Sequence, residues 1–186
     1  MSKRSIALFG ATLVSIIYGV TFTIAKDVMP TYVDAYGFIL LRVSGSTLLF
    51  WLIWLFMPKQ KIDLKDFPRI IAAAFFGVAF NMLTFFKGLS LTSPISASVI
   101  MVTTPMIVLI LSAIIMKERM RTRMVTGILL GLVGTGSLIL YGKAIGNGAN
   151  ATLGNALVLV NAISYGFYLI IVKKLMDKYN AFTFVK

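Results

Sequence analysis

Twenty-two consecutive residues without a charge form the stretch ISASVIMVTTPMIVLILSAIIM, which covers Ile95–Met116. The basic segment Lys117-Glu118-Arg119-Met120-Arg121-Thr122-Arg123 follows immediately. A helix rises about 1.5 Å per residue, so an apolar run of about 20 residues matches the hydrocarbon core of a bilayer. The stretch therefore predicts a transmembrane helix that ends in a basic loop.

Five further apolar runs of similar length flank this one along the chain. They lack the alternation of apolar and polar residues that strands of a membrane barrel require, which favours helices. The mean hydropathy is +0.93 and 13% of the residues are charged, so lipid is the expected solvent. We predict an all-α, polytopic membrane bundle with six transmembrane helices: Ser5–Ala25, Ala35–Met57, Ile70–Phe86, Ile95–Met116, Met124–Tyr141 and Leu153–Val172.

The basic residues divide unevenly between the two sides that these helices would create. The side that holds the N-terminus collects 14 of the 18 Lys and Arg residues, whereas the other side receives Lys26, Lys87 and Lys143. Loops that stay in the cytoplasm are enriched in Lys and Arg. We therefore predict a cytoplasmic N-terminus, with membrane lipid headgroups as partners of the basic loops.

Composition also excludes several classes of function. The net charge of +12 would suggest a nucleic-acid partner, but the charge sits in short loops beside a membrane, so no nucleic acid is expected. The chain has no cysteine and no histidine, so we expect no metal site and no cofactor. Because no carboxylate lies within a predicted span either, an intramembrane enzyme is not expected.

The sequence contains a trace of an internal repeat. When the chain is shifted by 147 positions, Tyr18-Gly19 overlies Tyr165-Gly166 and Lys26 overlies Lys173. An odd number of spans separates the matched segments, so the sixth span would cross the membrane opposite to the first, as in an inverted repeat. We expect residues 1–147 to form one five-helix unit and residues 148–186 to begin a second. Two complete units would be longer than this chain, so we expect it to be a fragment.

Several segments occur in the order and spacing of a known family. Tyr18–Lys26 has an aromatic-Gly start to a first helix that ends in a basic residue, and Pro30 and Arg42 follow it. The fourth and fifth spans add Ser96-Ala97-Ser98, Pro105, Lys117-Glu118-Arg119, Gly127, Gly131, Gly134 and Gly136. Together these segments resemble the EamA-type repeats of the drug/metabolite transporter superfamily.

The resemblance implies a function as well as a fold. It implies ten helices in two inverted units within a bacterial plasma (inner) membrane, and a carrier of small organic solutes that works by alternating access. Export of amino acids or related metabolites is the expected activity. The alternative is a non-transporting membrane subunit or an inactive truncated product. A homodimer is a further alternative, although antiparallel pairing of two chains would conflict with the uneven distribution of Lys and Arg between the two sides.

Polar, aromatic and helix-breaking residues within the spans are the candidates for binding a substrate. We expect a cavity between spans one, three, four and six. Tyr18 and Tyr165 are predicted to face each other across it, and Ser96 and Thr103 to share one face of span four because they are seven residues apart. The full set of substrate-binding candidates is Tyr18, Thr21, Arg42, Asn81, Phe85, Ser96, Thr103, Pro105 and Tyr165.

Three of these candidates also have a purely structural interpretation. Arg42, the charge inside a span, either anchors an anionic or zwitterionic solute or reaches outward near Asp34. Asn81 either lines the cavity or holds another helix. Pro105 leaves the carbonyl of Met101 without its helical partner, which either merely bends span four or also opens room for a solute.

Overall fold

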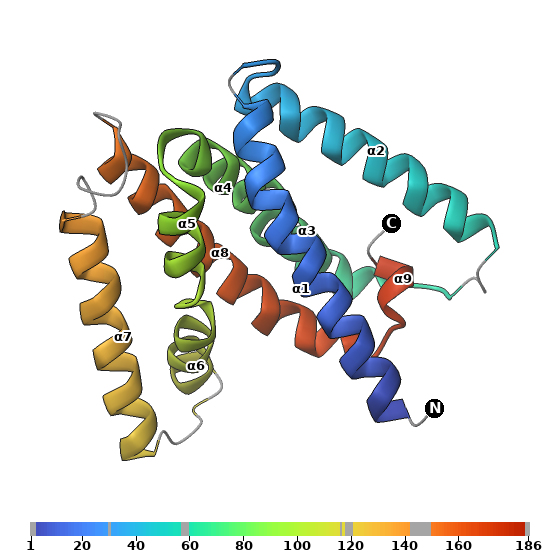
Figure 1. The fold of residues 1–186 in the computed structure, drawn as a ribbon. Helices are drawn as coiled ribbons and strands as arrows, with labels where there is room; N and C mark the ends of the chain where they lie inside the picture. Colours follow the sequence, from blue (N-terminus) through green and yellow to red (C-terminus); the bar gives the residue numbers. More distant parts are fainter. Residues whose placement is uncertain are drawn as a thin grey trace.

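The computed structural model describes residues 3–29, 31–56, 60–115, 117, 121–141 and 150–184, and every regular element within them is a helix (Figure 1). The elements are α1 (Lys3–Val28), α2 (Ala35–Leu55), the 3-10 turn η1 (Leu64–Asp66), α3 (Phe67–Ala74), the π-helical segment η2 (Phe75–Ala79), α4 (Phe80–Leu91), α5 (Pro94–Met101), α6 (Thr104–Ile115), α7 (Thr122–Tyr141), α8 (Ala151–Met176) and α9 (Ala181–Phe184).

The predicted fold class, an all-α membrane bundle, is confirmed. Five helical stretches among the described residues are long and apolar enough to cross a membrane: Arg4–Val28, Ala35–Leu55, Leu64–Leu91, Pro94–Ile115 and Ala151–Met176. They contain the first four predicted spans and the sixth, apart from Phe56, which follows the end of α2, and the final residues Met57 and Met116, which lie outside the described part of the chain. The fifth predicted span forms the helix α7.

The two ends of the bundle can be told apart by polar contacts. α3 begins where α8 ends, because Lys178 pairs with Asp66 there, and Figure 1 places the start of α1 at the same end. We call this end the N-side. At the opposite end, the far side, Lys26 Nζ donates hydrogen bonds to the carbonyl oxygens of Leu89 (3.0 Å) and Ser90 (2.8 Å). The carbonyl groups in the last turn of α4 have no following helical turn whose N–H groups could donate to them. Lys26 supplies the missing donors.

The helix α8 is the centre of the bundle. In the most apolar part of α8, 44% of the residues are buried inside the protein, whereas the corresponding share is 6% in α1 and in α2. α8 packs most extensively on α4, then on α6, and then equally on α3 and α5. Buried Val158 joins the far-side core around Phe85 and Leu89, whereas Val172 and Leu175 belong to a second cluster near the N-side. The exposed faces of α1 and α2 carry mostly large apolar side chains, which suits a lipid-facing surface.

Span three is longer and less regular than predicted. The expected helix Ile70–Phe86 is the middle of a stretch that runs from Leu64 to Leu91, interrupted by η2. A π-helical turn widens the backbone by one residue and often marks a local packing constraint. Here Gly77 lies within η2 against the ring of Tyr168 from α8, so tightly that a Cβ atom on residue 77 would overlap the ring.

Span four is broken rather than bent. α5 ends at Met101, Val102 and Thr103 form a turn, and α6 restarts at Thr104. Pro105 cannot donate a backbone hydrogen bond, so the ladder fails one turn earlier, and the β-branched residues in between favour helix weakly. The N–H groups of Met106 and Ile107 both donate to the carbonyl oxygen of Thr103 (3.0 Å each), which restarts the helix.

Some sequence predictions fall outside the described residues. These are Pro30, the pair Glu118-Arg119, and the boundary between the two units at residues 147 and 148.

Candidate functional site

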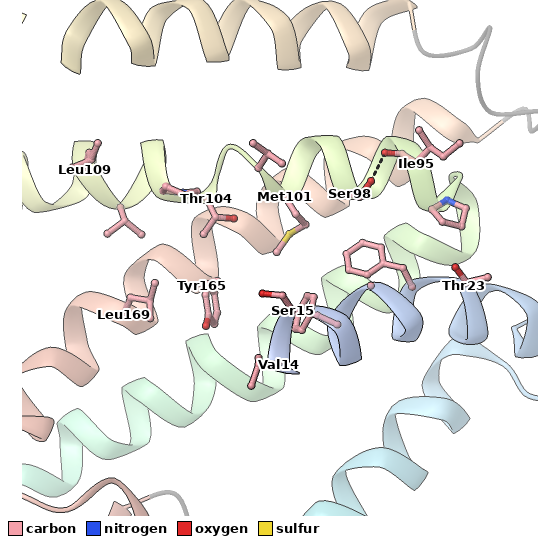
Figure 2. A pocket seen from close by; sticks show the side chains of 17 residues that line it. Val14, Ser15, Thr23, Ile95, Ser98, Met101, Thr104, Leu109, Tyr165 and Leu169 are labelled. Carbon is pink, nitrogen blue, oxygen red and sulfur yellow. Dashed lines mark hydrogen bonds between the residues drawn. The ribbon is translucent and has the colours of Figure 1, made fainter. Parts of the chain in front are cut away.

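A cleft of about 1170 Å³ lies between α1, α5, α6 and α8. Three of the sequence candidates line it, namely Tyr18, Pro105 and Tyr165, and Figure 2 labels Tyr165 among the lining residues. The cleft runs from the far-side ends of α1 and α5, at Thr23 and Pro94, toward the N-side at Leu109 and Leu169. It is therefore framed by spans one, four and six of the predicted set.

Most of the cleft wall is apolar, and its polar groups are hydroxyls. Ser15 Oγ donates to the carbonyl of Ala11 at 2.9 Å, and Ser98 Oγ donates to the carbonyl of Ile95 at 2.8 Å, so both hydroxyls have partners within their own helices. No Lys, Arg, Asp or Glu is among the described residues that line the cleft. An apolar wall with a few oriented polar groups is the usual design of a site for a small organic molecule.

A second, much smaller pocket of about 50 Å³ adjoins the cleft. Thr21, Arg42, Asn81 and Phe85 line it, and Tyr18 and Phe22 belong to both pockets. The ring of Phe22 meets that of Phe85 edge to face, with 5.1 Å between centroids. Five of the nine candidates therefore gather in the smaller pocket, and span three contributes there rather than to the large cleft.

Arg42 lies against an aromatic ring in the smaller pocket. Its Cζ is 5.5 Å from the centroid of the Phe86 ring, a cation–π arrangement. Among the described residues, no carboxylate forms an ion pair with Arg42. Arg42 is an exposed residue of α2, so its guanidinium is accessible to an anion.

Asn81 links two helices as well as lining a pocket. Its side-chain Nδ2 lies 3.5 Å from the carbonyl oxygen of Asn161 in α8, and Asn161 Nδ2 donates to the carbonyl of Asn81 at 2.9 Å. Paired amides of this kind hold membrane helices together. Both interpretations of Asn81 from the sequence therefore describe its position.

Ser96 and Thr103 line neither pocket. Ser96 is 1% exposed and belongs to the start of α5, where Ser93 Oγ accepts from its backbone N–H at 3.1 Å. Thr103 is 3% exposed and donates its hydroxyl to the carbonyl of Ile100 at 2.6 Å. Their expected common face assumed a continuous helix, and the break at Val102 and Thr103 removes that phase relationship.

Sequence reasoning missed several residues of the cleft. Thr104 begins α6 and lines the cleft, together with Ser98, Phe22 and Thr23. The signal that could have found Thr104 was its place directly before Pro105, because a proline at the start of a helix brings the preceding residue to the helix N-terminus.

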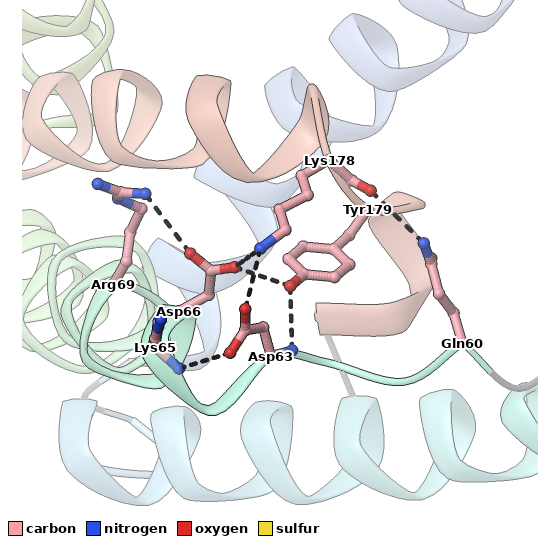
Figure 3. Close-up of polar contacts among 7 residues, drawn as sticks. All are labelled: Gln60, Asp63, Lys65, Asp66, Arg69, Lys178 and Tyr179. Carbon is pink, nitrogen blue, oxygen red and sulfur yellow. Dashed lines mark hydrogen bonds and ion pairs between the residues drawn. The ribbon is translucent and has the colours of Figure 1, made fainter.

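A polar cluster, which we call the N-side clamp, joins the start of α3 to the residues after α8 (Figure 3). Asp66 is 9% exposed and its Oδ2 accepts from Lys178 Nζ at 2.5 Å and from Tyr179 Oη at 2.7 Å. The backbone N–H of Asp63 donates to Tyr179 Oη at 3.0 Å. Hydrogen bonding to Asp66, and then to Tyr179, raises the pKa of Lys178 above its ordinary value.

Gln60 extends the N-side clamp to the segment after α8. Its Oε1 accepts from the backbone N–H of Asn180 at 3.1 Å and from the hydroxyl of Thr183 at 3.2 Å. Loops at the N-side thus bind each other through side chains on both partners. In the described part of the chain, no group of three His, Cys, Asp or Glu side chains is placed to hold a metal ion.

Comparison with known proteins places this bundle among transporters. A model of the EamA-like transporter family matches residues 5–140. An uncharacterized transporter of Archaeoglobus fulgidus is 32% identical over 124 residues, which are 67% of this chain and 43% of that protein. No solved structure matches the chain.

Two relatives in Bacillus subtilis are also named uncharacterized transporters. YyaM is 32% identical over 134 residues, which cover 69% of this chain and 43% of YyaM. YetK is 27% identical over 118 residues, 63% of this chain and 36% of YetK. The match spans less than half the length of these relatives. The family model covers most of the chain, and the apolar helices make it a multi-pass membrane protein, so the chain belongs to the EamA-like transporter family.

Proposed function

We propose that this protein carries small organic solutes across a bacterial plasma (inner) membrane and exports amino acids or related metabolites. In this proposal the N-side faces the cytoplasm, residues 1–147 form the first of two inverted units, and residues 148–186 begin the second. The observation that carries the proposal is the cleft of about 1170 Å³ between α1, α5, α6 and α8, in a chain of a transporter family.

The positions of the cleft and of the N-side clamp support alternating access. The cleft reaches the far side at Thr23 and Pro94, whereas Asp66 and Lys178 hold α3 to the end of α8 at the N-side. In alternating access the cleft would close at the far side and open at the N-side. The contacts at these two ends would therefore have to form and break in turn, as in other inverted-repeat carriers. Contacts that join one end are therefore expected to break during the transport cycle.

The candidate residues take distinct roles in this proposal. Tyr18, Pro105 and Tyr165 contact the solute in the cleft, and Thr21, Arg42, Asn81 and Phe85 act from the adjoining pocket. Arg42 attracts the negatively charged group of an anionic or zwitterionic solute. Ser96 and Thr103 do not contact the solute in this proposal. They act indirectly, because Ser96 helps to hold the start of α5 and Thr103 helps to hold the turn between α5 and α6.

Transport is tested with purified protein in liposomes that contain one radiolabelled amino acid at a time. We expect efflux above that of protein-free liposomes for at least one amino acid. Arg42→Ala should slow this efflux because the anion loses its counter-charge. Arg42→Lys should restore part of it because the positive charge returns.

Folding controls make the result interpretable. Each variant is compared at equal amounts of monodisperse protein, and Thr12→Val, on an exposed face of α1, is the matched control that should transport like the unchanged protein. Folded protein that moves no amino acid or related metabolite would favour the other interpretation, a non-transporting membrane subunit.

A further inference from the structure

The break in span four places the start of a helix inside the membrane, on the wall of the cleft. α6 has 12 residues and begins at Thr104. Thr103, the residue before it, donates its hydroxyl backward to Ile100 and so belongs to the end of α5. Pro105 has no N–H, and the N–H groups of the next two residues donate to the carbonyl oxygen of Thr103, so the positive end of the helix dipole, rather than a row of free N–H groups, favours an anion or hydrogen-bond acceptor here.

A buried hydroxyl without a partner lies at this helix start. Thr104 is 8% exposed, and its Oγ1 forms no hydrogen bond within the described part of the chain. Thr104 lines the cleft, and Figure 2 shows its side chain on the face of the break that looks toward Tyr165. Buried polar atoms are almost always hydrogen-bonded, so an exception at a binding cleft indicates a missing partner.

The neighbours of Thr104 restrict what that partner can be. Ser15 and Ser98 already donate their hydroxyls to carbonyls of their own helices, so Thr104 differs from them in having its donor free. Met101, Val108 and Leu169 surround this part of the cleft with apolar surface. A hydroxyl donor beside a helix N-terminus, with no acidic residue among the cleft-lining residues, favours an oxygen that carries negative charge.

We propose that Thr104 and the N-terminus of α6 bind the carboxylate of the solute, while the apolar part of the same molecule fills the cleft. The substrate class is therefore a small carboxylate with an apolar body. This inference rests on the proposed transport function: Thr104 hydrogen-bonds the carboxylate in the cleft, while the positive charge of Arg42 in the adjoining pocket attracts the same group over a longer distance.

The anion preference of this subsite can be measured without knowing the solute. The chain has no cysteine, so Thr104→Cys and Ser98→Cys each provide a single thiol in the cleft. Both proteins are reacted in liposomes with an anionic and with a cationic methanethiosulfonate of similar size. In both reactions the thiolate attacks the reagent, forms a mixed disulfide and releases methanesulfinate, so the ratio of the two rates reports the local potential and is independent of the thiol pKa.

We expect the ratio of anionic to cationic rate to be about two- to fivefold higher for Thr104→Cys than for Ser98→Cys, which is the usual strength of a helix terminus. The ratio should persist when Arg42→Gln is added. An equal ratio at both positions, a ratio that disappears with Arg42→Gln, or no reaction at residue 104 would each overturn the assignment.

A transport measurement tests the hydrogen bond itself. With any amino acid that the unchanged protein moves, Thr104→Val should raise the KM about tenfold or more, because a bond to a charged group is lost, while Thr104→Ser should restore it. Transport that is unaffected by Thr104→Val would contradict the carboxylate assignment. If the unchanged protein moves no amino acid, the proposed function fails, and the thiol rates alone decide the anion subsite.

Discussion

The backbones of Gly88 and Gly154 touch where α4 crosses α8 near the far side. The carbonyl oxygen of Gly154 lies 2.8 Å from the position of a Cβ atom on residue 88, and the carbonyl oxygen of Gly88 lies 2.8 Å from that of residue 154. Absence of both side chains permits this approach, because glycine leaves no Cβ between the two helices. The contact sets the distance between the bundle's central helix and span three.

Adding one methyl group at this crossing should separate the helices. Gly88→Ala and Gly154→Ala should each destabilise the protein by about 1–3 kcal/mol, since the methyl group meets backbone that cannot rotate away. The measurement is thermal unfolding of purified protein in detergent. Gly127→Ala is the matched control, because nothing lies within 4 Å of its added Cβ, and it should melt no lower than the unchanged protein. If Gly88→Ala melts at the same temperature as the unchanged protein, α4 and α8 do not pack as closely at this crossing as described here.

Thr92 and Asn155 form a buried polar pair between the end of span three and α8. Thr92 Oγ1 donates to Asn155 Oδ1 at 2.5 Å. Thr92→Val should cost about 1 kcal/mol because it leaves the amide oxygen without this donor. The double variant Thr92→Val/Asn155→Leu should lose less than the sum of the single variants, which a double-mutant cycle detects. Strict additivity would mean that the two side chains do not interact.

The contribution of Lys178 to the stability of the N-side clamp should decline only at high pH. The pKa of Lys178 is raised in the folded protein, so its contribution is fully present below the unfolded pKa of about 10.4 and declines as the pH rises through the folded pKa. The difference in melting temperature between the unchanged protein and Lys178→Met should therefore stay constant from about pH 7 to about pH 9.5 and shrink above it.

A second lysine at the same end controls for general charge effects. Lys174 is exposed near the end of α8, and Lys174→Met should show no such pH-dependent difference. A Lys178→Met difference that already shrinks between about pH 7 and about pH 9 would contradict the raised pKa.

Single cysteines can also test the proposed orientation. Tyr32 is 81% exposed beyond the end of α1, and Lys61 is exposed at the N-side. With a cytoplasmic N-side, Tyr32→Cys should react with a membrane-impermeant maleimide in intact cells, whereas Lys61→Cys should react only after permeabilisation. The opposite labelling pattern would place the N-side outside the cell.

The sequence predicts the course of the chain through the membrane because hydrophobic length is a local property. The run Ile95–Met116 predicts a transmembrane helix regardless of which helices pack against it. The observed helices follow the predicted runs closely. The predicted ends were less accurate: α8 extends beyond Leu153–Val172 in both directions, because a helix can continue past the apolar run through residues such as Lys173 and Lys174.

The candidate site was harder to predict because it depends on geometry between helices. Tyr18 and Tyr165 were found through the internal repeat, and both line the cleft. Ser96 and Thr103 were paired by helical spacing, which holds only along an unbroken helix, and the break hides both from the cleft. The same break exposes Thr104 to the cleft, and no periodicity in the sequence marks that change.

The central place of α8 has a consequence for biogenesis. The partners of α8, namely α3, α4, α5 and α6, all precede it in sequence, so they enter the membrane before it is synthesised. Until then, the carbonyl of Phe76, which later accepts from Ser164 at 2.7 Å, and the carboxylate of Asp66 lack their partners. Insertion of α8, with the residues that follow it, supplies these partners, so a ribosome that stalls before residue 151 leaves the earlier helices with unpaired polar groups, a state that the quality-control proteases of the membrane can recognise.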